Sequence, residues 1–237
     1  MKVKVRIIKA KDDSEATEKY IQGHLNVLAT YGVTKVTSAD TSWTEDSNVY
    51  LILVEAIDDN RILGGARIQL NSEAFPLPVV EATKDLDAKI LDYISDFKPL
   101  EMAELCGLWN SKEVAGYGIG SIYLGRVGVA ISSQLNIKRL LAFCSPATLR
   151  NCYKVGFRII STLGDNGKFF YPKEGLIATA LEIDDIENLS SAHFEDRDFI
   201  FKLRNNLSHL SQETGPKGSM DVEFDLKLPH LTSTSHG

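Results

Sequence analysis

The spacing of hydrophobic and polar residues changes repeatedly along the first part of the chain. Residues 2–9 alternate and are rich in β-branched side chains, which predicts a strand. Hydrophobic residues at helical spacing predict a helix over 14–31. Two apolar runs follow at 48–56 and 62–70, separated by a short polar turn. Their length and the turn between them predict an antiparallel hairpin.

Helix and strand patterns continue to alternate in the next part of the chain. Residues 71–83 contain two prolines and predict a loop, and a helix that includes Leu86 and Phe97 is expected to end at Pro99. Residues 101–109 predict a further strand. The remaining core elements are predicted as a helix over 119–135, a strand over 137–145, a helix over 147–155, and strands over 157–162 and 175–183. This order describes a mixed α/β sheet with helices on both faces.

The C-terminal part has its own pattern. Residues 195–210 predict a helix, and "ETGPKGS" (213–219) predicts a linker. Residues 221–228 alternate strictly and predict a strand, which must pair with a sheet edge of this chain or of a neighbour. We therefore expect a domain over 1–183 and an ordered extension within 184–237, and we expect a homodimer.

Composition narrows the class of protein. The chain has 26 basic and 32 acidic residues, a net charge of −6, which argues against general nucleic-acid binding. It has no apolar run that suits a signal peptide or a membrane span. The three cysteines lack a CxxC spacing and the five histidines lack a metal-binding spacing, so we expect free thiols, no metal and a cytoplasmic protein.

One short stretch suggests chemistry. "EVAGYGIGSIYL" leads from a predicted strand into a predicted helix and carries Gly116, Gly118 and Gly120. Helix N-termini attract anions, and glycines let a diphosphate approach the backbone, although tight turns use the same residues. A Walker loop would need Lys after its last glycine, and a Rossmann fingerprint would need glycine at Ser121. Neither dinucleotide motif is therefore present.

"AGYGIGSIYL" resembles the pyrophosphate-binding motif of the GNAT acyltransferases, Arg/Gln-x-x-Gly-x-Gly/Ala. Downstream, "CYKVGF" (152–157) resembles the family's Leu-Tyr-x-Lys-x-Gly-Phe signature, in the expected order and with the expected elements between. The resemblance covers residues 2–183. It implies an α/β (α+β) fold with a mixed, mostly antiparallel central sheet, helices on both faces and a C-terminal extension.

The resemblance also implies a site for acyl-CoA, with acetyl-CoA as the simplest donor. Two positions depart from the family pattern: Ala115 stands where Arg or Gln is usual, and Pro146 stands where Asn is frequent. Backbone N–H groups are still expected to hold the diphosphate. The implied cofactor-binding residues are Leu108, Trp109, Asn110, Ala115, Gly116, Tyr117, Gly118, Ile119, Gly120, Ser121 and Ser145.

Three side chains are candidates for catalysis or acceptor binding. Glu104 matches the strand-borne glutamate base of some members, with Glu101 as the second choice and a solvent-facing strand residue as the alternative. Tyr153 is the implied general acid, or else a packing tyrosine. Arg67 is a candidate to bind an acceptor carboxylate, or else a surface residue.

The function implied is transfer of an acetyl or other acyl group from CoA to the amine of a small molecule or peptide. One alternative is a longer acyl donor, bound to CoA or carrier protein, with 71–100 lining the acyl pocket as in acyl-homoserine lactone synthases. The N-terminal Arg/Trp/Asp pattern of those enzymes is not found. A non-catalytic acyl-CoA-binding regulatory module is the alternative of a different class, which Ala115 favours.

Overall fold

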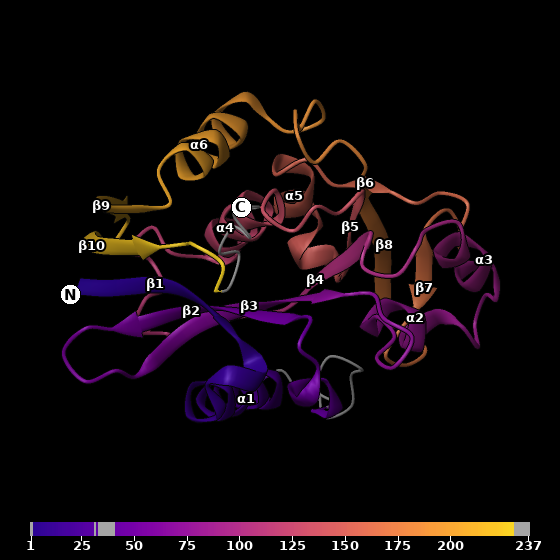
Figure 1. Ribbon diagram of the computed structural model, residues 1–237, viewed down its shortest axis with the longest axis horizontal. Helices are drawn as coiled ribbons and strands as arrows, with labels where there is room; N and C mark the ends of the chain where they lie inside the picture. The colour runs from indigo at the N-terminus through magenta and orange to yellow at the C-terminus, as the bar shows by residue number, and fades with distance from the viewer. Residues whose placement is uncertain (1, 31, 33–40, 230–237) are drawn as a thin grey trace, which may run out of the picture.

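The computed structural model describes residues 2–30, 32 and 41–229. One ten-stranded sheet runs through the described chain, in the order β6-β8-β5-β4-β3-β2-β1-β10-β9, with β7 paired to β8 (Figure 1). Its strands are β1 (Lys2–Lys9), β2 (Val49–Ala56), β3 (Ile62–Leu70), β4 (Met102–Asn110), β5 (Arg139–Cys144), β6 (Arg158–Ile159), β7 (Lys168–Phe170), β8 (Ile177–Ile183), β9 (Ser208–Gly215) and β10 (Gly218–Asp225).

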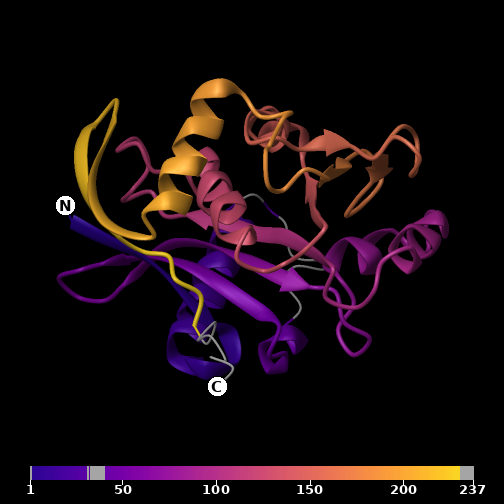
Figure 2. The same cartoon turned by 45° about the horizontal axis from the view of Figure 1, so that its top comes forward.

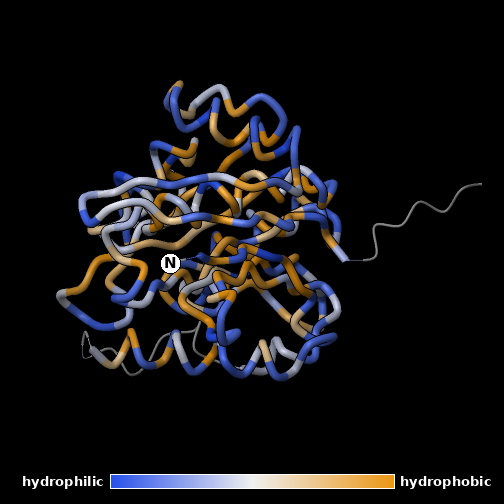
Figure 3. Tube along the Cα trace, turned by 90° about the vertical axis from the view of Figure 1, so that its left-hand side faces the viewer, coloured by the Kyte–Doolittle hydropathy of each residue, from blue (hydrophilic) through white to orange (hydrophobic). Residues whose placement is uncertain are grey.

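Helices cover both faces of this sheet, and the hydrophobic parts of the chain turn toward it (Figures 1 and 3). On one face lie α1 (Ser14–Thr30), α2 (Pro78–Thr83) and α3 (Lys89–Ser95); on the other lie α4 (Ser121–Ser132), α5 (Pro146–Lys154) and α6 (Phe194–Asn205). Strand alternation sorts the side chains of β4 between the two layers. Leu105 packs in the core beside α4, whereas Met102 packs with α2 and α3.

The sheet opens between β4 and β5. These parallel strands pair at only three positions, from Met102 with Arg139 to Glu104 with Leu141. Beyond that point β4 continues to Asn110 and β5 continues to Cys144 without further pairing. The strands therefore diverge toward their C-terminal ends, and we call this gap in the ladder the β4–β5 opening.

A β-bulge lies in β4 beside this opening. Gly65 on β3 pairs with Trp109, and Arg67 pairs with Cys106, so two residues of β4 stand opposite Ala66. Those two residues are Gly107 and Leu108. A bulge leaves one of its residues out of the hydrogen-bonded ladder, so a backbone group becomes available at this point of the strand.

The C-terminal part joins the same sheet, because β10 pairs in parallel with β1. The linker predicted over 213–219 is wrong: these residues end β9, form a turn and begin β10. The predicted helix over 195–210 ends at Asn205, and Leu210 is an exposed residue of β9. Apart from Leu210, the residues of β9 are polar or glycine, so only its backbone pairing with β10 identifies it as a strand. The domain division at residue 183 stays a prediction.

Smaller differences occur elsewhere. The loop predicted over 71–83 contains α2, which begins at Pro78, and proline suits the first position of a helix because its missing N–H has no partner there. Strand β7 was not predicted because it is only three residues long. Among the described residues, no helix has both the length and the apolar character needed to cross a bilayer.

Candidate active site

The loop between β4 and α4, residues 111–120, has two kinds of glycine; we call it the glycine loop. Gly116 and Gly118 have φ of 91° and 90°, a region that L side chains rarely adopt. Gly120 is extended and precedes α4 as its N-cap residue, and a Cβ atom placed on it would meet nothing within 4 Å. The N-terminus of α4 carries no side-chain cap at Gly120. Its free N–H groups are therefore open to an anion.

The other residues of the glycine loop differ in exposure. Ala115 is exposed, Tyr117 is half-buried, and Ile119 is buried in the core beside α4. Ser121 is the first residue of α4. Val114 and Ile119 therefore anchor the loop through fully buried side chains, and the backbone beside Ile119 is what a ligand would meet.

The end of β4 leads directly to this loop. Leu108 and Asn110 are half-buried, and Leu108 packs toward the α4 side. Trp109 points to the opposite face and is core: a Cβ atom on Gly23 of α1 would lie 2.1 Å from its ring. The Tyr20 hydroxyl donates a 2.6 Å hydrogen bond to the Gly107 carbonyl, which fixes the bulge to α1.

Glu104 is buried on the α1 side of β4, only 2% exposed, so a solvent-facing position is excluded. The Val79 N–H donates a 2.7 Å hydrogen bond to its Oε2 atom. Burial raises the pKa of Glu104 to about 7, against the lowering effects of this hydrogen bond and of the Arg67 charge. A carboxyl group with such a pKa exchanges protons near neutral pH, as a general base must.

Arg67 is 1% exposed, so the alternative of a surface arginine is wrong. Its Nε donates to Cys106 Sγ at 3.2 Å, and its guanidinium lies 4.4 Å from the ring centre of Trp43. Its two terminal nitrogens, Nη1 and Nη2, are buried and have no hydrogen-bond partner in the described chain. A buried guanidinium with unused donors is costly unless an acceptor group reaches it.

Neighbouring groups make the surroundings of Arg67 neutral or donor-rich. Burial, followed by the Arg67 charge, lowers the pKa of His24 to about 4. Burial also raises the pKa of Cys106 to about 11, so its thiol stays protonated. The indole nitrogens of Trp43 and Trp109 are likewise buried without a partner among the described residues. Gln69 Oε1 is a buried acceptor without a partner on the same side, so this side of β3 and β4 suits a ligand that supplies more hydrogen-bond acceptors than donors.

The remaining predicted residues lie on α5. Ser145 is its exposed N-cap residue, and Tyr153 is half-buried in its last turn, packed against the core beside α4. Helix α5 follows directly after β5, the other border of the β4–β5 opening. Cys144 and Cys152 are half-buried free thiols, and Cys106 is a buried one.

No protein-family profile matches the sequence, and no curated protein matches it significantly. Solved structures do match. FeeM, an N-acyl amino acid synthase from uncultured soil microbes, superposes with a TM-score of 0.59 at 12% identity, covering 81% of this chain and 100% of FeeM. BjaI, a CoA-dependent acyl-homoserine lactone synthase solved with SAM and isopentyl-CoA, gives 0.53 at 12% identity, covering 86% and 90%. Escherichia coli ElaA gives 0.52 at 11% identity, covering 76% and 99%.

The chain has the GNAT fold. The prediction of fold class, a mixed and mostly antiparallel sheet with helices on both faces, is confirmed. Within this GNAT fold, the glycine loop and the bulge follow each other at one border of the β4–β5 opening. Arg67 on β3 and Glu104 on β4 lie on the α1 side of the sheet. Arg67 pairs with Cys106 of β4, and Glu104 pairs with Gln69 of β3.

Sequence reasoning missed several groups around these residues. Val79 and Trp43 come from segments whose patterns gave no sign of a contact with β3 or β4. Gln69 stands opposite Glu104, and its Nε2 donates to the Pro76 carbonyl at 3.0 Å. A period-of-two analysis of β3 and β4 would have placed Arg67, Gln69, Glu104 and Cys106 on one face, but not the helices that cover them.

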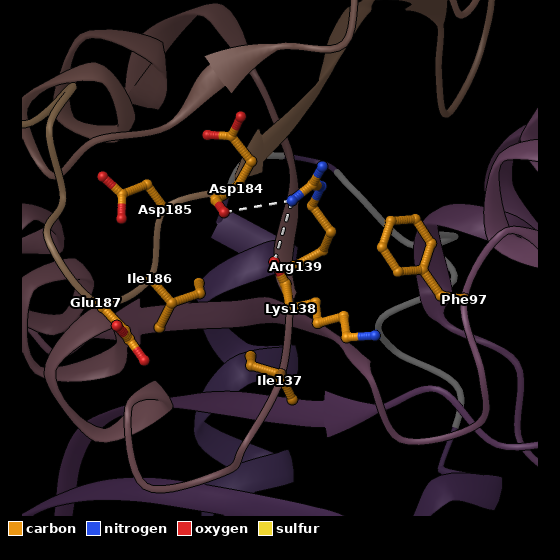
Figure 4. A pocket seen from close by; sticks show the side chains of 8 residues that line it. All are labelled: Phe97, Ile137, Lys138, Arg139, Asp184, Asp185, Ile186 and Glu187. Carbon is orange, nitrogen blue, oxygen red and sulfur yellow. Dashed lines mark hydrogen bonds between the residues drawn. The ribbon is translucent and has the colours of Figure 1, made fainter.

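A separate surface pocket of about 470 Å³ lies at the other end of β5 (Figure 4). It is lined by Phe97, Ile137, Lys138, Arg139 and residues 184–187, and Arg139 donates within it to the Asp184 carbonyl at 3.3 Å. Acidic and basic side chains are mixed there. The part of the chain that the structure describes contains no cluster of three or more metal-binding side chains. The pocket lies at the N-terminal end of β5, whereas the β4–β5 opening lies toward its C-terminal end.

Proposed function

We propose that this GNAT-fold protein is an acyltransferase that moves an acetyl or other acyl group from CoA to an amine. The observation that carries the proposal is Glu104, a buried carboxyl group whose pKa is about 7, on the strand that leads into the glycine loop. The GNAT fold, shared with FeeM and BjaI, supports the same conclusion. A structural glutamate in a core would be expected to carry an ion-pair partner instead.

In the proposed reaction, the N–H groups from Gly118 to Ile122 hold the diphosphate of acyl-CoA. The Tyr117 N–H, which was expected to share this role, donates instead to the Val114 carbonyl at 3.3 Å. The backbone of Leu108, Trp109 and Asn110 hydrogen-bonds the pantetheine arm, with Ser145 as a further contact from α5. An amide of the bulge near Leu108 polarises the thioester carbonyl.

The chemical step is direct attack by the acceptor amine. The amine nitrogen forms a bond with the thioester carbon, and the carbon–sulfur bond breaks. Glu104 accepts the proton lost by the amine, and Tyr153 donates a proton to the departing CoA thiolate. No metal ion is needed in this scheme, since the bulge amide stabilises the developing oxyanion.

The acceptor we propose is a small amine that also carries a carboxylate. Arg67 supports this, because its Nη1 and Nη2 atoms are buried and unused, and a carboxylate can accept from both at once. FeeM is named as an N-acyl amino acid synthase, so one protein of this fold acts on such acceptors. The alternative acceptor is the amine of a peptide.

The experiment measures free thiol released from acetyl-CoA in the presence of matched amines, such as tyrosine and tyramine. Faster release with tyrosine is expected, and Arg67→Met should reduce the difference. Release with tyramine alone would contradict the carboxylate acceptor. Tight CoA binding without release from any acyl-CoA would favour the non-catalytic binding module.

A longer acyl donor is the second candidate. BjaI was solved with isopentyl-CoA, and here the segment over 71–100 folds onto the sheet beside Glu104 through α2 and α3. A series of acyl-CoA and acyl-carrier-protein donors of increasing chain length tests it. Cytoplasmic location and a homodimer stay predictions, which fractionation and mass in solution would check.

A further inference from the structure

The C-terminal hairpin, made of β9, β10 and the turn between them, rests on the glycine loop (Figure 2). The Lys217 N–H donates a 2.8 Å hydrogen bond to the Gly116 carbonyl. Gly215 is so close that a Cβ atom on it would lie 2.4 Å from the Gly118 nitrogen. A Cβ atom on Gly118 would in turn lie 3.0 Å from the Thr214 backbone. Gly116 and Gly118 are thus occupied on one side by protein, whereas Gly120 faces open space.

The side chain of Lys217 extends along the same loop. A Cβ atom on Gly116 would lie 2.9 Å from its Cγ atom, 3.0 Å from its Cδ atom and 3.3 Å from its Cε atom. Three successive carbons of the lysine therefore lie within 3.3 Å of the Cβ position of Gly116, beside the glycine backbone. Lys217 is an exposed residue, so its ammonium group remains accessible to a ligand at the loop.

The charges around this lysine leave it available. Of the three acids of β10, Glu223 and Asp225 pair with Lys4, and Asp221 accepts from Gln212 Nε2 at 3.1 Å. Arg61 pairs with Glu113 of the glycine loop at 2.7 Å. No ion pair among the described residues includes Lys217.

One carboxylate remains close to the loop. Glu213 of β9 has its Cβ atom 3.2 Å from the Cβ position of Gly118, and its carboxylate accepts from Ser211 Oγ at 3.1 Å, back along its own strand. It also lies near enough to Tyr123 to raise the pKa of that phenol, after burial. Its carboxylate thus points toward α4 and along β9.

The loop itself lacks a cation at the position of Ala115, which is exposed. We propose that Lys217 supplies this missing charge and binds the diphosphate of CoA, so that the C-terminal hairpin is part of the cofactor site. The proposal rests on the proposed function, since it assigns one more residue to the same acyl-CoA site. A lysine reaches phosphate as a point charge, which suits a flexible side chain at the edge of a backbone cradle.

The test is calorimetric titration at low salt with CoA, 3′-dephospho-CoA and pantetheine. Lys217→Met keeps the carbon chain over Gly116 and removes the charge; Lys227→Met is the matched control, exposed and ten residues further along, past the far end of β10. Lys217→Met should weaken CoA and dephospho-CoA about fivefold and leave pantetheine unchanged, as expected for one exposed ion pair. Lys217→Arg should bind as the wild type does.

Four other outcomes of this titration would each contradict a part of the proposal. Equal CoA affinity in Lys217→Met and wild type would overturn the role of Lys217 and leave the proposed function standing. Loss of CoA affinity with normal dephospho-CoA affinity would overturn the diphosphate contact. Weaker pantetheine binding together with a lower melting temperature would show a packing role instead. A wild-type protein that does not bind CoA would overturn both the proposed function and this inference.

Discussion

The Val79 N–H, near the start of α2, donates a 2.7 Å hydrogen bond to the Glu104 carboxylate on β4. The connection between β3 and β4 therefore holds the proposed base in position. This hydrogen bond favours the charged form of Glu104, whereas burial favours the neutral form, and burial is the larger effect. The two opposing effects keep the pKa near 7 instead of far above it.

Glu104→Gln should alter how stability depends on pH. Because the pKa of Glu104 is about 7 in the folded protein and near 4.5 ordinarily, its neutral form stabilises the fold below pH 4.5, and this contribution is lost as pH rises through 7. The loss is about 3 kcal/mol. Glutamine can still accept from Val79, so the variant should gain stability relative to wild type between pH 5 and pH 8 in denaturant titrations.

Glu101→Gln is the control for that experiment. Glu101 pairs with Lys138 at 2.8 Å, and a side-chain hydrogen bond from Lys138 lowers its pKa. A carboxylate with a lowered pKa stabilises the fold above its ordinary pKa, so this variant should lose stability relative to wild type as pH rises. If Glu104→Gln also loses stability relative to wild type between pH 5 and pH 8, its carboxyl is not held neutral by burial.

The rate of acyl transfer should depend on the protonation state of the same carboxyl group, Glu104. In the wild type, kcat/KM is expected to rise with pH up to an apparent pKa of about 7, because only the carboxylate accepts the amine proton. Glu104→Gln should lower the rate most near neutral pH and least at high pH, where the amine loses its own proton. A variant profile parallel to that of the wild type would point to another base.

Gly118 and Gly120 should respond differently to substitution. Gly118→Ala places a Cβ atom against the Thr214 backbone at a φ of 90°, which should cost about 1–3 kcal/mol of stability. A Cβ atom on Gly120 would meet nothing within 4 Å, so the melting temperature of Gly120→Glu should stay near that of the wild type.

Substitutions at Gly120 also separate an effect on protein stability from an effect on CoA binding. CoA should raise the melting temperature of the wild type and of Gly120→Ala, but not that of Gly120→Glu, because a carboxylate at the N-terminus of α4 repels phosphate. If CoA raises the melting temperature of Gly120→Glu as much as that of the wild type, the diphosphate does not bind at this end of the loop.

Tyr153→Phe tests the proposed general acid. The ring is half-buried against the core beside α4, so phenylalanine should preserve the packing and the melting temperature. Turnover is expected to fall about tenfold or more while CoA affinity stays unchanged, since the hydroxyl acts only when the thiolate leaves. Wild-type turnover in single-turnover kinetics would leave Tyr153 as a packing residue.

Phe224→Ala tests whether the C-terminal hairpin is part of the core. Phe224 is 2% exposed and packs on Tyr123 of α4, with ring centres 6.0 Å apart. Its loss should cost about 3–5 kcal/mol. Leu210→Ala on β9 is the control, since that side chain is 69% exposed and should change stability little. Equal unfolding curves for both variants would mean that the hairpin does not contribute to the core.

The sequence alone determined the elements whose pattern is set by local physics. Strands β1 and β3 have the predicted bounds, and α1 begins at the predicted Ser14; residue 31, the last of the predicted helix, lies outside the described residues. Burial on one face imposes a clear period on β1 and α1, whereas β3 is buried on both faces and is predicted from its length and the turn before it. The glycine loop between a strand and a helix was also predictable, since its backbone requires glycine at Gly116 and Gly118.

Only the tertiary structure decided which segments meet. Glu104 could be placed on a strand from its neighbours, but its burial and its hydrogen bond from Val79 both require segments distant in the sequence to meet. These two opposing effects set its pKa. The same holds for Lys217, which local sequence assigned to a linker and which the pairing of β9 with β10 carries onto the glycine loop. Burial and electrostatics depend on distances in space, and hydrophobic periodicity records only which face of its own element a residue occupies.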